Sequence, residues 1–219
     1  VLCNPGDEVL VPRPSYPLFD HLATLDGIVA CPYSLEYHGR WIVDLDSIER
    51  TWSPRTRAVL IVSPNNPTGS CVQASELHEL AARCVRSDAA LICDEVFADY
   101  VWSSPSAEAN GHVLFERDVL SFSLGGLSKT VGLPQVKLGW MAIGGPQDVV
   151  RQAHARLEVA ADTYLSVSTP VQVSASTLLA NGAAVRAQIQ ARLLKNREAL
   201  GKRVACTSSC QVLAADGGW

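Results

Sequence analysis

Apolar and amphipathic stretches alternate along most of this chain of 219 residues. Continuous apolar runs such as Ala58–Val62 and Ala89–Cys93 are typical of strands buried on both faces of a parallel sheet. Ser75–Arg86 instead repeats its apolar residues at helical spacing, which predicts an amphipathic helix. The predicted strands are Glu8–Pro12, Ile28–Pro32, Ala58–Val62, Ala89–Cys93, Val119–Phe122 and Leu138–Ile143, and the predicted helices are Tyr16–Leu25, Asp46–Trp52, Ser75–Arg86, Gln147–Ala161 and Ala184–Leu200.

Strands that alternate with helices predict an α/β fold, with a mostly parallel sheet flanked by helices. We expect a large domain over residues 1–165, incomplete at its N-terminus because Val1–Val11 begins within a helix end, a turn and a strand. After Pro170 the pattern becomes helical and ends in a short strand near Cys210–Leu213. Residues 166–219 are therefore expected to hold linking helices and the truncated start of a smaller α/β domain.

The composition of the chain argues against several classes of protein. Apolar residues make up 47% of the chain and charged residues 18%, which indicates a globular protein, and a net charge of −4 without a basic run argues against a nucleic-acid partner. Charges, glycines and prolines interrupt every apolar run well before membrane-spanning length, and no secretion leader opens the chain. The seven scattered cysteines favour a reduced, cytoplasmic setting, and none of them completes a metal site.

Three polar side chains follow predicted strands and suggest a common site. Asn66 follows Ala58–Val62, Asp94 follows the next buried run, and Lys129 lies in a Gly/Ser-rich loop after a third. Because the carboxyl ends of parallel strands meet at one edge of a sheet, we expect these residues to converge. A lysine amine can attack a carbonyl to give a Schiff base, and pyridoxal 5′-phosphate is its usual partner. Taken singly, each residue has an ordinary interpretation as a solvated lysine, a cap or a turn.

The motifs around these residues resemble those of fold type I pyridoxal-phosphate enzymes, specifically the class I/II aminotransferases. Ser63–Gly69 reads SPNNPTG and is similar to their Asn-Pro-Thr-Gly motif, and Asp94–Phe97 reads DEVF and is similar to their Asp-x-x-Tyr motif. Leu127–Trp140 is similar to their Schiff-base segment. The resemblance spans essentially the whole chain and implies an aminotransferase that acts through a Lys129 Schiff base. It also implies a large domain of the pyridoxal-phosphate transferase type.

The resemblance assigns a role to individual residues. Lys129 matches the Schiff-base lysine that also moves the proton between substrate Cα and cofactor C4′, and Asp94 matches the partner of the pyridine nitrogen. Asn66 matches the donor to the phenolate oxygen. Tyr16 matches the aromatic residue stacked on the cofactor, with a core aromatic residue at a helix start as the alternative. Lys137, eight residues after Lys129, matches the basic residue that binds the phosphate.

Three positions depart from the family pattern. Phe97 stands where tyrosine is usual, so one hydrogen bond to the phenolate oxygen is missing. Lys137 stands where arginine is commoner, and a lysine lacks the bidentate fork of a guanidinium. Gly126 stands where many relatives have a phosphate-binding serine, and Ser123, Ser128 or backbone N–H groups are the candidates to replace it.

The resemblance further implies an amino acid and a 2-oxo acid as substrates, and a homodimer. It places the glycine-rich phosphate loop before Val1 and the arginine that binds the substrate carboxylate after Trp219. Other readings remain open: a C–S or β-lyase or a cyclopropane-forming synthase on the same scaffold, a non-catalytic aminotransferase-like regulator, or a fragment that does not fold alone.

Overall fold

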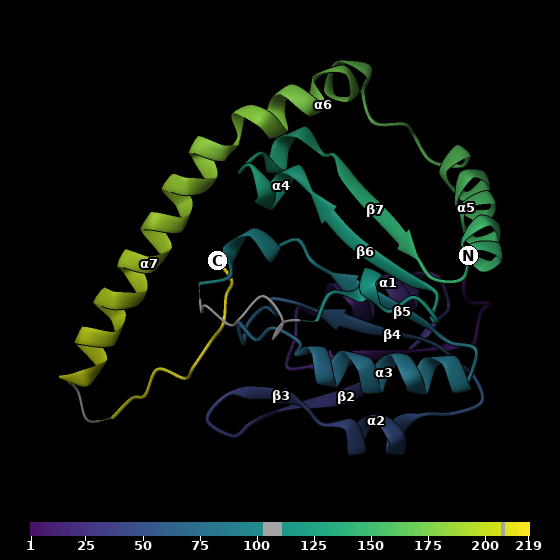
Figure 1. Ribbon diagram of the computed structural model, residues 1–219, viewed down its shortest axis with the longest axis horizontal. Helices are drawn as coiled ribbons and strands as arrows, with labels where there is room; N and C mark the ends of the chain where they lie inside the picture. Colours follow the sequence, from purple (N-terminus) through teal and green to yellow (C-terminus); the bar gives the residue numbers. More distant parts are fainter. Residues whose placement is uncertain (103–110, 207–208) are drawn as a thin grey trace.

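A computed structural model of the chain describes residues 1–102, 111–206 and 209–219. Its centre is a seven-stranded sheet with the strand order β3-β2-β1-β4-β5-β6-β7 (Figure 1). The strands from β2 to β6 in this order run parallel to one another, while β3 and β7 pair antiparallel at the two edges. The predicted fold, a mostly parallel sheet flanked by helices, is confirmed.

The elements have the following bounds. The strands are β1 (Glu8–Arg13), β2 (Val29–Tyr37), β3 (Trp41–Val43), β4 (Thr56–Val62), β5 (Ala90–Asp94), β6 (Ser121–Gly126) and β7 (Gly139–Gly144). The α-helices are α1 (Leu18–Leu25), α2 (Leu45–Thr51), α3 (Ala74–Arg86), α4 (Leu127–Thr130), α5 (Gln147–Asp162), α6 (Thr169–Asn181) and α7 (Ala183–Ala205). Three short 3₁₀ turns are η1 (Ala98–Tyr100), η2 (Val113–Phe115) and η3 (Pro134–Val136).

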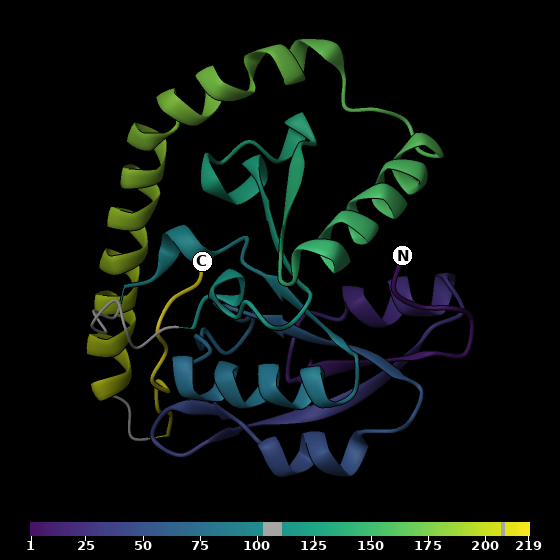
Figure 2. The same cartoon turned by 45° about the vertical axis from the view of Figure 1, so that its right-hand side comes forward.

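The central strands separate two apolar cores. Side chains alternate between the faces of a strand, so Leu91 and Cys93 of β5 enter the larger core, while Ala90 and Ile92 enter the smaller one. The larger core includes apolar residues of α2 and α3, and the smaller one includes Ala153 of α5. Figures 1 and 2 both place α2 and α3 together and α5 away from them. Burial on both faces explains why β4 and β5 are continuous apolar runs.

Helix α3 has a well-defined start. Gln73 and Glu76 form a capping box, in which the Glu76 carboxylate accepts a hydrogen bond from the Gln73 backbone N–H at 2.7 Å. The other oxygen of this carboxylate accepts from the Val43 N–H at 3.1 Å. One buried glutamate therefore fixes both the beginning of α3 and the position of the edge strand β3.

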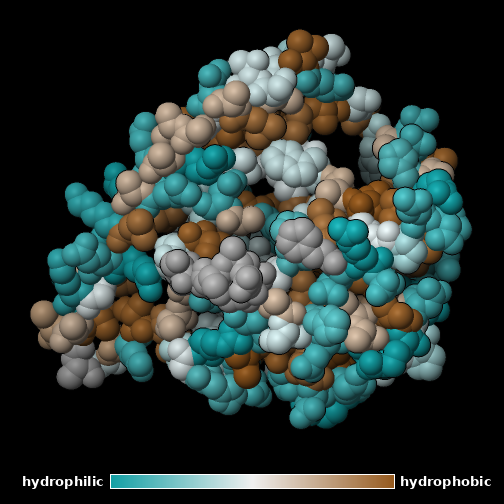
Figure 3. Space-filling model, in the orientation of Figure 1, coloured by the Kyte–Doolittle hydropathy of each residue, from teal (hydrophilic) through white to brown (hydrophobic). Residues whose placement is uncertain are grey.

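Helices α6 and α7 form an arch over one end of the sheet (Figure 2). Neither helix has a buried residue, and Val173 of α6 is 77% exposed. Figure 3 shows apolar surface gathered along the inner side of this arch, toward β7. A hydrogen bond of 2.6 Å from Gln190 Nε2 to the Asp99 carbonyl connects α7 to η1. In the described part of the chain, no helix combines the length and the apolar character needed to cross a membrane.

Several boundaries differ from the sequence prediction. Helix α1 begins at Leu18, not Tyr16, because Pro17 occupies its N-cap, and β2 continues to Tyr37 so that it can pair with the unpredicted β3. The short strand predicted near Cys210–Leu213 is wrong. This segment has no regular structure, and the following Ala214 N–H donates to a side chain, the Tyr37 hydroxyl, at 3.0 Å.

Candidate active site

The three candidate residues all lie at the carboxyl edge of the sheet. Asp94 is the last residue of β5, Asn66 lies in the turn after β4, and Lys129 lies in α4, which directly follows β6. These strands are neighbours in the order β4-β5-β6, so their ends lie side by side. The chain thus places an amide, a carboxylate and an amine at one edge, where ligands bind in open α/β sheets.

Backbone hydrogen bonds hold Asp94 between its two neighbours. The Ser63 N–H donates to the Asp94 carbonyl at 3.0 Å, and the Glu95 N–H donates to the Leu124 carbonyl at 3.0 Å. The Asp94 carboxylate accepts from the Val96 N–H at 3.1 Å. Burial raises the pKa of Asp94 above its ordinary value, the Val96 N–H opposes this shift, and the neighbouring Glu95 adds to it. No cationic side chain pairs with this carboxylate within the described residues.

The turn after β4 is held by an asparagine that the sequence analysis did not single out. Asn65 is buried, and its Nδ2 donates to the Pro14 carbonyl at 2.9 Å and to Thr68 Oγ1 at 2.7 Å. Its Oδ1 accepts from Ser15 Oγ at 2.7 Å. Asn65 therefore joins the Pro14–Ser15 segment to the turn and leaves its neighbour Asn66 exposed. The two asparagines are adjacent in the sequence, and only their burial separates their roles.

Lys129 is anchored through its backbone. Its carbonyl accepts a hydrogen bond from the buried Tyr100 hydroxyl at 2.6 Å. The segment that carries it is closed at its base by the hydrogen bond from Leu127 N to the Leu138 carbonyl, 3.0 Å long. In the described part of the chain, Lys129 Nζ has no hydrogen bond or ion pair, and it lies 5.3 Å from the centre of the Phe97 ring.

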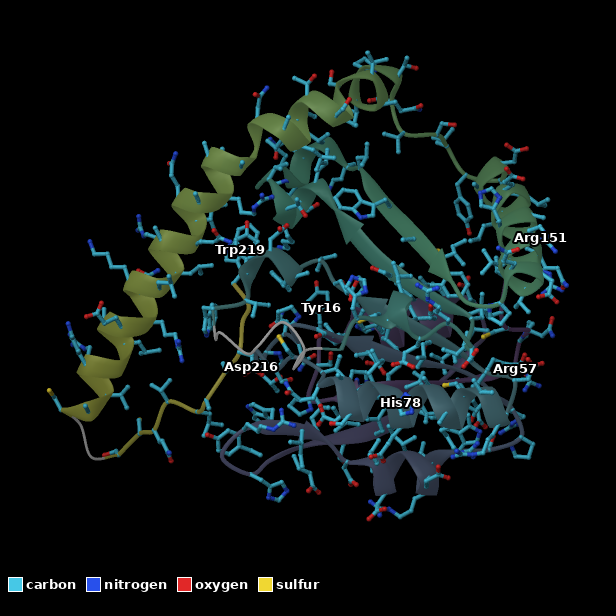
Figure 4. The ribbon with its side chains drawn as sticks, in the orientation of Figure 1. Tyr16, Arg57, His78, Arg151, Asp216 and Trp219 are labelled. Atoms are coloured by element: carbon cyan, nitrogen blue, oxygen red, sulfur yellow. The ribbon has the colours of Figure 1, made fainter. Side chains whose placement is uncertain are left out.

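A second ring beside the amine belongs to Trp219, which the sequence patterns did not identify as a site residue. Its ring centre lies 4.5 Å from Lys129 Nζ, 5.3 Å from the Tyr100 ring and 6.2 Å from the Phe97 ring. Figure 4 shows Trp219 on the C-terminal segment, between α7 and the sheet. The aromatic residue itself was the available signal, but only the fold brings it back to Lys129.

The other predicted site residues, Tyr16, Ser128 and Lys137, make no contact with one another. Tyr16 adjoins Ser15, which the buried Asn65 holds, but the residue is 49% exposed and its ring packs against no other ring of the described residues. Ser128 is half-buried. Lys137 is exposed and adopts a left-handed backbone conformation with φ 58°. The structure therefore brings Lys129 and Phe97 into contact and leaves these three near the same edge without a mutual contact.

Glu95 forms a polar cluster on the other face of β5. It accepts a hydrogen bond from Ser123 Oγ and lies 3.7 Å from His112 Nε2. Ser123 pairs in register with Cys93, which is two residues before Glu95, so these side chains share a face that Asp94 does not. Ser123 is thereby engaged with Glu95. No group of three potential ligands for a metal ion occurs within the described ranges.

Comparisons with known proteins agree with this arrangement. Residues 1–218 match the family described as aminotransferase class I and II. Glutamate-pyruvate aminotransferase AlaA of Escherichia coli is 32% identical over 178 residues, which are 81% of this chain and 44% of that protein. Human tyrosine aminotransferase is 33% identical over 149 residues, 68% of this chain and 32% of that protein. The chain thus spans less than half the length of these relatives.

Solved structures of aminotransferases superpose on this chain. An alanine aminotransferase from Pyrococcus furiosus superposes with a TM-score of 0.79 at 28% identity, covering 92% of this chain and 51% of that one. A tyrosine aminotransferase from Leishmania infantum superposes with a TM-score of 0.84 over 99% of this chain and 57% of that one. At 24% identity, this second likeness supports the fold alone.

Proposed function

Because the chain belongs to the class I and II aminotransferase family, whose cofactor is pyridoxal 5′-phosphate, we propose that it forms the cofactor-binding part of an enzyme that transfers an amino group between an amino acid and a 2-oxo acid. The cofactor supplies an electron sink for the electron pair left when a proton leaves substrate Cα. The observation that carries the proposal is the position of Asn66, Asp94 and Lys129 at the ends of three neighbouring strands.

Lys129 is the proposed catalytic residue. Its Nζ would hold the cofactor through the aldehyde and, when free, would accept the proton that leaves substrate Cα. Two features support this role. The amine is not engaged by any hydrogen bond or ion pair of the described residues, and the Phe97 and Trp219 rings shield part of it from water.

Asp94 and Asn66 are proposed to hold the cofactor ring. A half-buried carboxylate with a raised pKa and no cationic partner among the described residues fits the protonated pyridine nitrogen, because that cation would stabilise its charged form. The Asn66 amide is exposed and makes no side-chain hydrogen bond within the described part of the chain, so its N–H is available for the phenolate oxygen.

Tyr16, Ser128, Lys137 and Phe97 are proposed to complete the cofactor site. Tyr16 stacks on the cofactor ring from a segment that Asn65 fixes. Ser128 and Lys137 bind the phosphate from the same edge, as a hydroxyl donor and a point charge. Phe97 would contact the cofactor ring without a hydroxyl, so the phenolate oxygen would receive one hydrogen bond fewer.

The test is covalent labelling. The chain is incubated with pyridoxal phosphate, reduced with borohydride and digested, and the labelled peptide is identified by mass spectrometry. We expect the label on Lys129, none in Lys129→Ala, and an unchanged label in the control Lys195→Ala, whose lysine is exposed on α7. A label that persists in Lys129→Ala would refute the assignment. Formation of a 2-oxo acid measures transfer itself, whereas release of ammonia would indicate a lyase.

We also propose a homodimer in a reduced, cytoplasmic setting, and a division near residue 165 between the large domain and the linking helices. All seven cysteines are unpaired, which supports the redox setting. Residues 165–168 have no regular structure, and the following helices have no buried residue, which supports the division. Sedimentation measures the oligomeric state, and limited proteolysis at the linker tests the division.

A further inference from the structure

A cavity of about 170 Å³ lies next to the proposed catalytic lysine. Three segments that are far apart in the sequence form it: the turn after β4, the residues around η1 and the C-terminal segment. Asn66 and Pro67 line it from the turn, Phe97 and Trp102 from the second segment, and Trp219 from the third. Phe97 and Trp219 are also the rings that face Lys129 Nζ, so the cavity and the amine share walls.

Backbone hydrogen bonds fix the C-terminal wall of this cavity. The Asp216 and Gly217 N–H groups donate to the Gly69 carbonyl at 2.8 and 2.9 Å, and the Gly218 N–H donates to the Tyr100 carbonyl at 3.0 Å. Trp102 Nε1 donates to the Ala215 carbonyl at 3.0 Å. The segment is thus held on both sides, which keeps the Trp219 ring centre 4.5 Å from Lys129 Nζ.

The cavity walls combine aromatic rings with uncharged polar groups. Of the described residues that line the cavity, none has a charged side chain, and three have aromatic rings. The nearby guanidinium of Arg197 lies 5.4 Å from the centre of the Trp102 ring and does not line the cavity. A carboxylate placed here would lose its hydration without gaining a cation, which is unfavourable, whereas an apolar group would contact three rings.

The volume indicates the size of the group that fits. An apolar cavity of about 150 Å³ is large enough to bind a benzene molecule. The present cavity is of similar size, so it can receive a branched aliphatic group or a single ring.

We propose that this cavity receives the uncharged side chain of the amino-acid substrate, and that Trp219 and Trp102 determine specificity for apolar and aromatic amino acids over dicarboxylic ones. The proposal rests on the proposed aminotransferase function, because it takes Lys129 as the reactive group. Trp219 acts through contact with the substrate side chain.

Binding is tested first, on the chain without cofactor, so that the result does not depend on catalysis. Ligand-observed NMR titrations use benzyl alcohol as a neutral ring and succinate as a dicarboxylate. We expect benzyl alcohol to bind and succinate not to bind. Trp219→Ala should lower the affinity for benzyl alcohol about tenfold, since the loss of one ring contact costs about 1.4 kcal/mol.

Three controls accompany this titration. Trp219→Phe, which keeps a ring, should lose less affinity than Trp219→Ala. Trp52→Phe, at the end of α2, should bind as the unchanged chain does, because Trp52 lies against Arg83 and not at the cavity. A chain with a C-terminal amide, which removes the charge of the terminal carboxylate, should give the same order of affinities.

Turnover is tested second, with pyridoxal phosphate bound. The first half-reaction is compared for phenylalanine, alanine and aspartate as the rate of 2-oxo acid formation. We expect the rate with phenylalanine to exceed the rate with aspartate. Trp219→Ala should reduce the rate with phenylalanine at least about tenfold more than the rate with alanine. A preference for aspartate, or an equal loss for every amino acid, would overturn the inference. Absence of the borohydride label on Lys129, with the ring probe still bound at Trp219, would instead refute the proposed function and leave the cavity assignment standing.

Discussion

Burial disfavours the ionised form of the Asp94 carboxyl group, and this predicts that the stability of the fold depends on pH. Because burial raises its pKa, the folded state keeps the carboxyl proton more tightly than the unfolded state does. Asp94 therefore contributes nothing below its ordinary pKa and an increasing cost as pH rises toward the raised value.

Asp94→Asn removes this cost and keeps an oxygen for the Val96 N–H. Without cofactor, we expect the variant to be more stable than the original chain at neutral pH, with a difference that disappears in acid. Urea unfolding at several pH values measures this difference. With cofactor, the order should reverse, because the amide cannot hold the pyridinium proton. Equal stability at every pH would contradict the argument.

Asn65 and Asn66 are adjacent, but we predict that substituting them changes stability by very different amounts. Asn65→Ala removes three side-chain hydrogen bonds from a buried position and should lower the free energy of unfolding by about 2–3 kcal/mol. Asn66→Ala, its matched control, should change it by less than about 0.5 kcal/mol, because the side chain is exposed. Thermal or urea unfolding compares the two. A larger loss for Asn66→Ala would reverse the structural assignment.

At the scale of elements, the fit between the C-terminal segment and the turn after β4 depends on glycine. A Cβ on Gly217 would lie 2.8 Å from Pro64 Cγ and 2.8 Å from the Tyr100 carbonyl oxygen. Gly217→Ala should therefore release the segment and lower stability by about 1–3 kcal/mol. Faster hydrogen exchange at the Asp216 and Gly218 N–H groups would report the release.

Gly201 provides the control for this substitution. It lies in α7, and a Cβ there meets no atom within 4 Å. Gly201→Ala should leave exchange in the C-terminal segment unchanged and raise helix stability by up to about 1 kcal/mol. If both variants leave that exchange unchanged, the close approach at Gly217 does not hold the segment.

Much of the element order could be predicted because it follows from local patterns. The buried strands β4 and β5 are continuous apolar runs, and their ends identify Asn66 and Asp94. The strand β3 was missed because three residues are too few for a recognisable alternation, and it depends on pairing with β2. Asn65 and Trp219 could not be found from the sequence, because their roles depend on contacts with residues far along the chain.

At the scale of the whole molecule, stability is uneven. The core strands β4 and β5 are buried on both faces, whereas α7 has no buried residue and is connected to η1 by Gln190 and by Arg186, whose Nη1 lies 3.6 Å from the Asp99 carboxylate. We predict that α7 amides exchange hydrogen at much lower opening free energy than β5 amides. Arg186→Ala should accelerate exchange in α7 and leave β5 unchanged. Uniform protection of both elements would contradict this division.

The loop that carries Lys129 limits how far the reactive amine can move. Its two ends, Leu127 and Leu138, are joined by a hydrogen bond at the sheet, so it forms a closed ring on the rigid core. Helix α7 holds the same loop at a second point, because Arg186 Nη1 donates to the Thr130 carbonyl at 3.5 Å. The backbone of Lys129 is therefore held in place, and its amine moves only by rotation about the side-chain bonds.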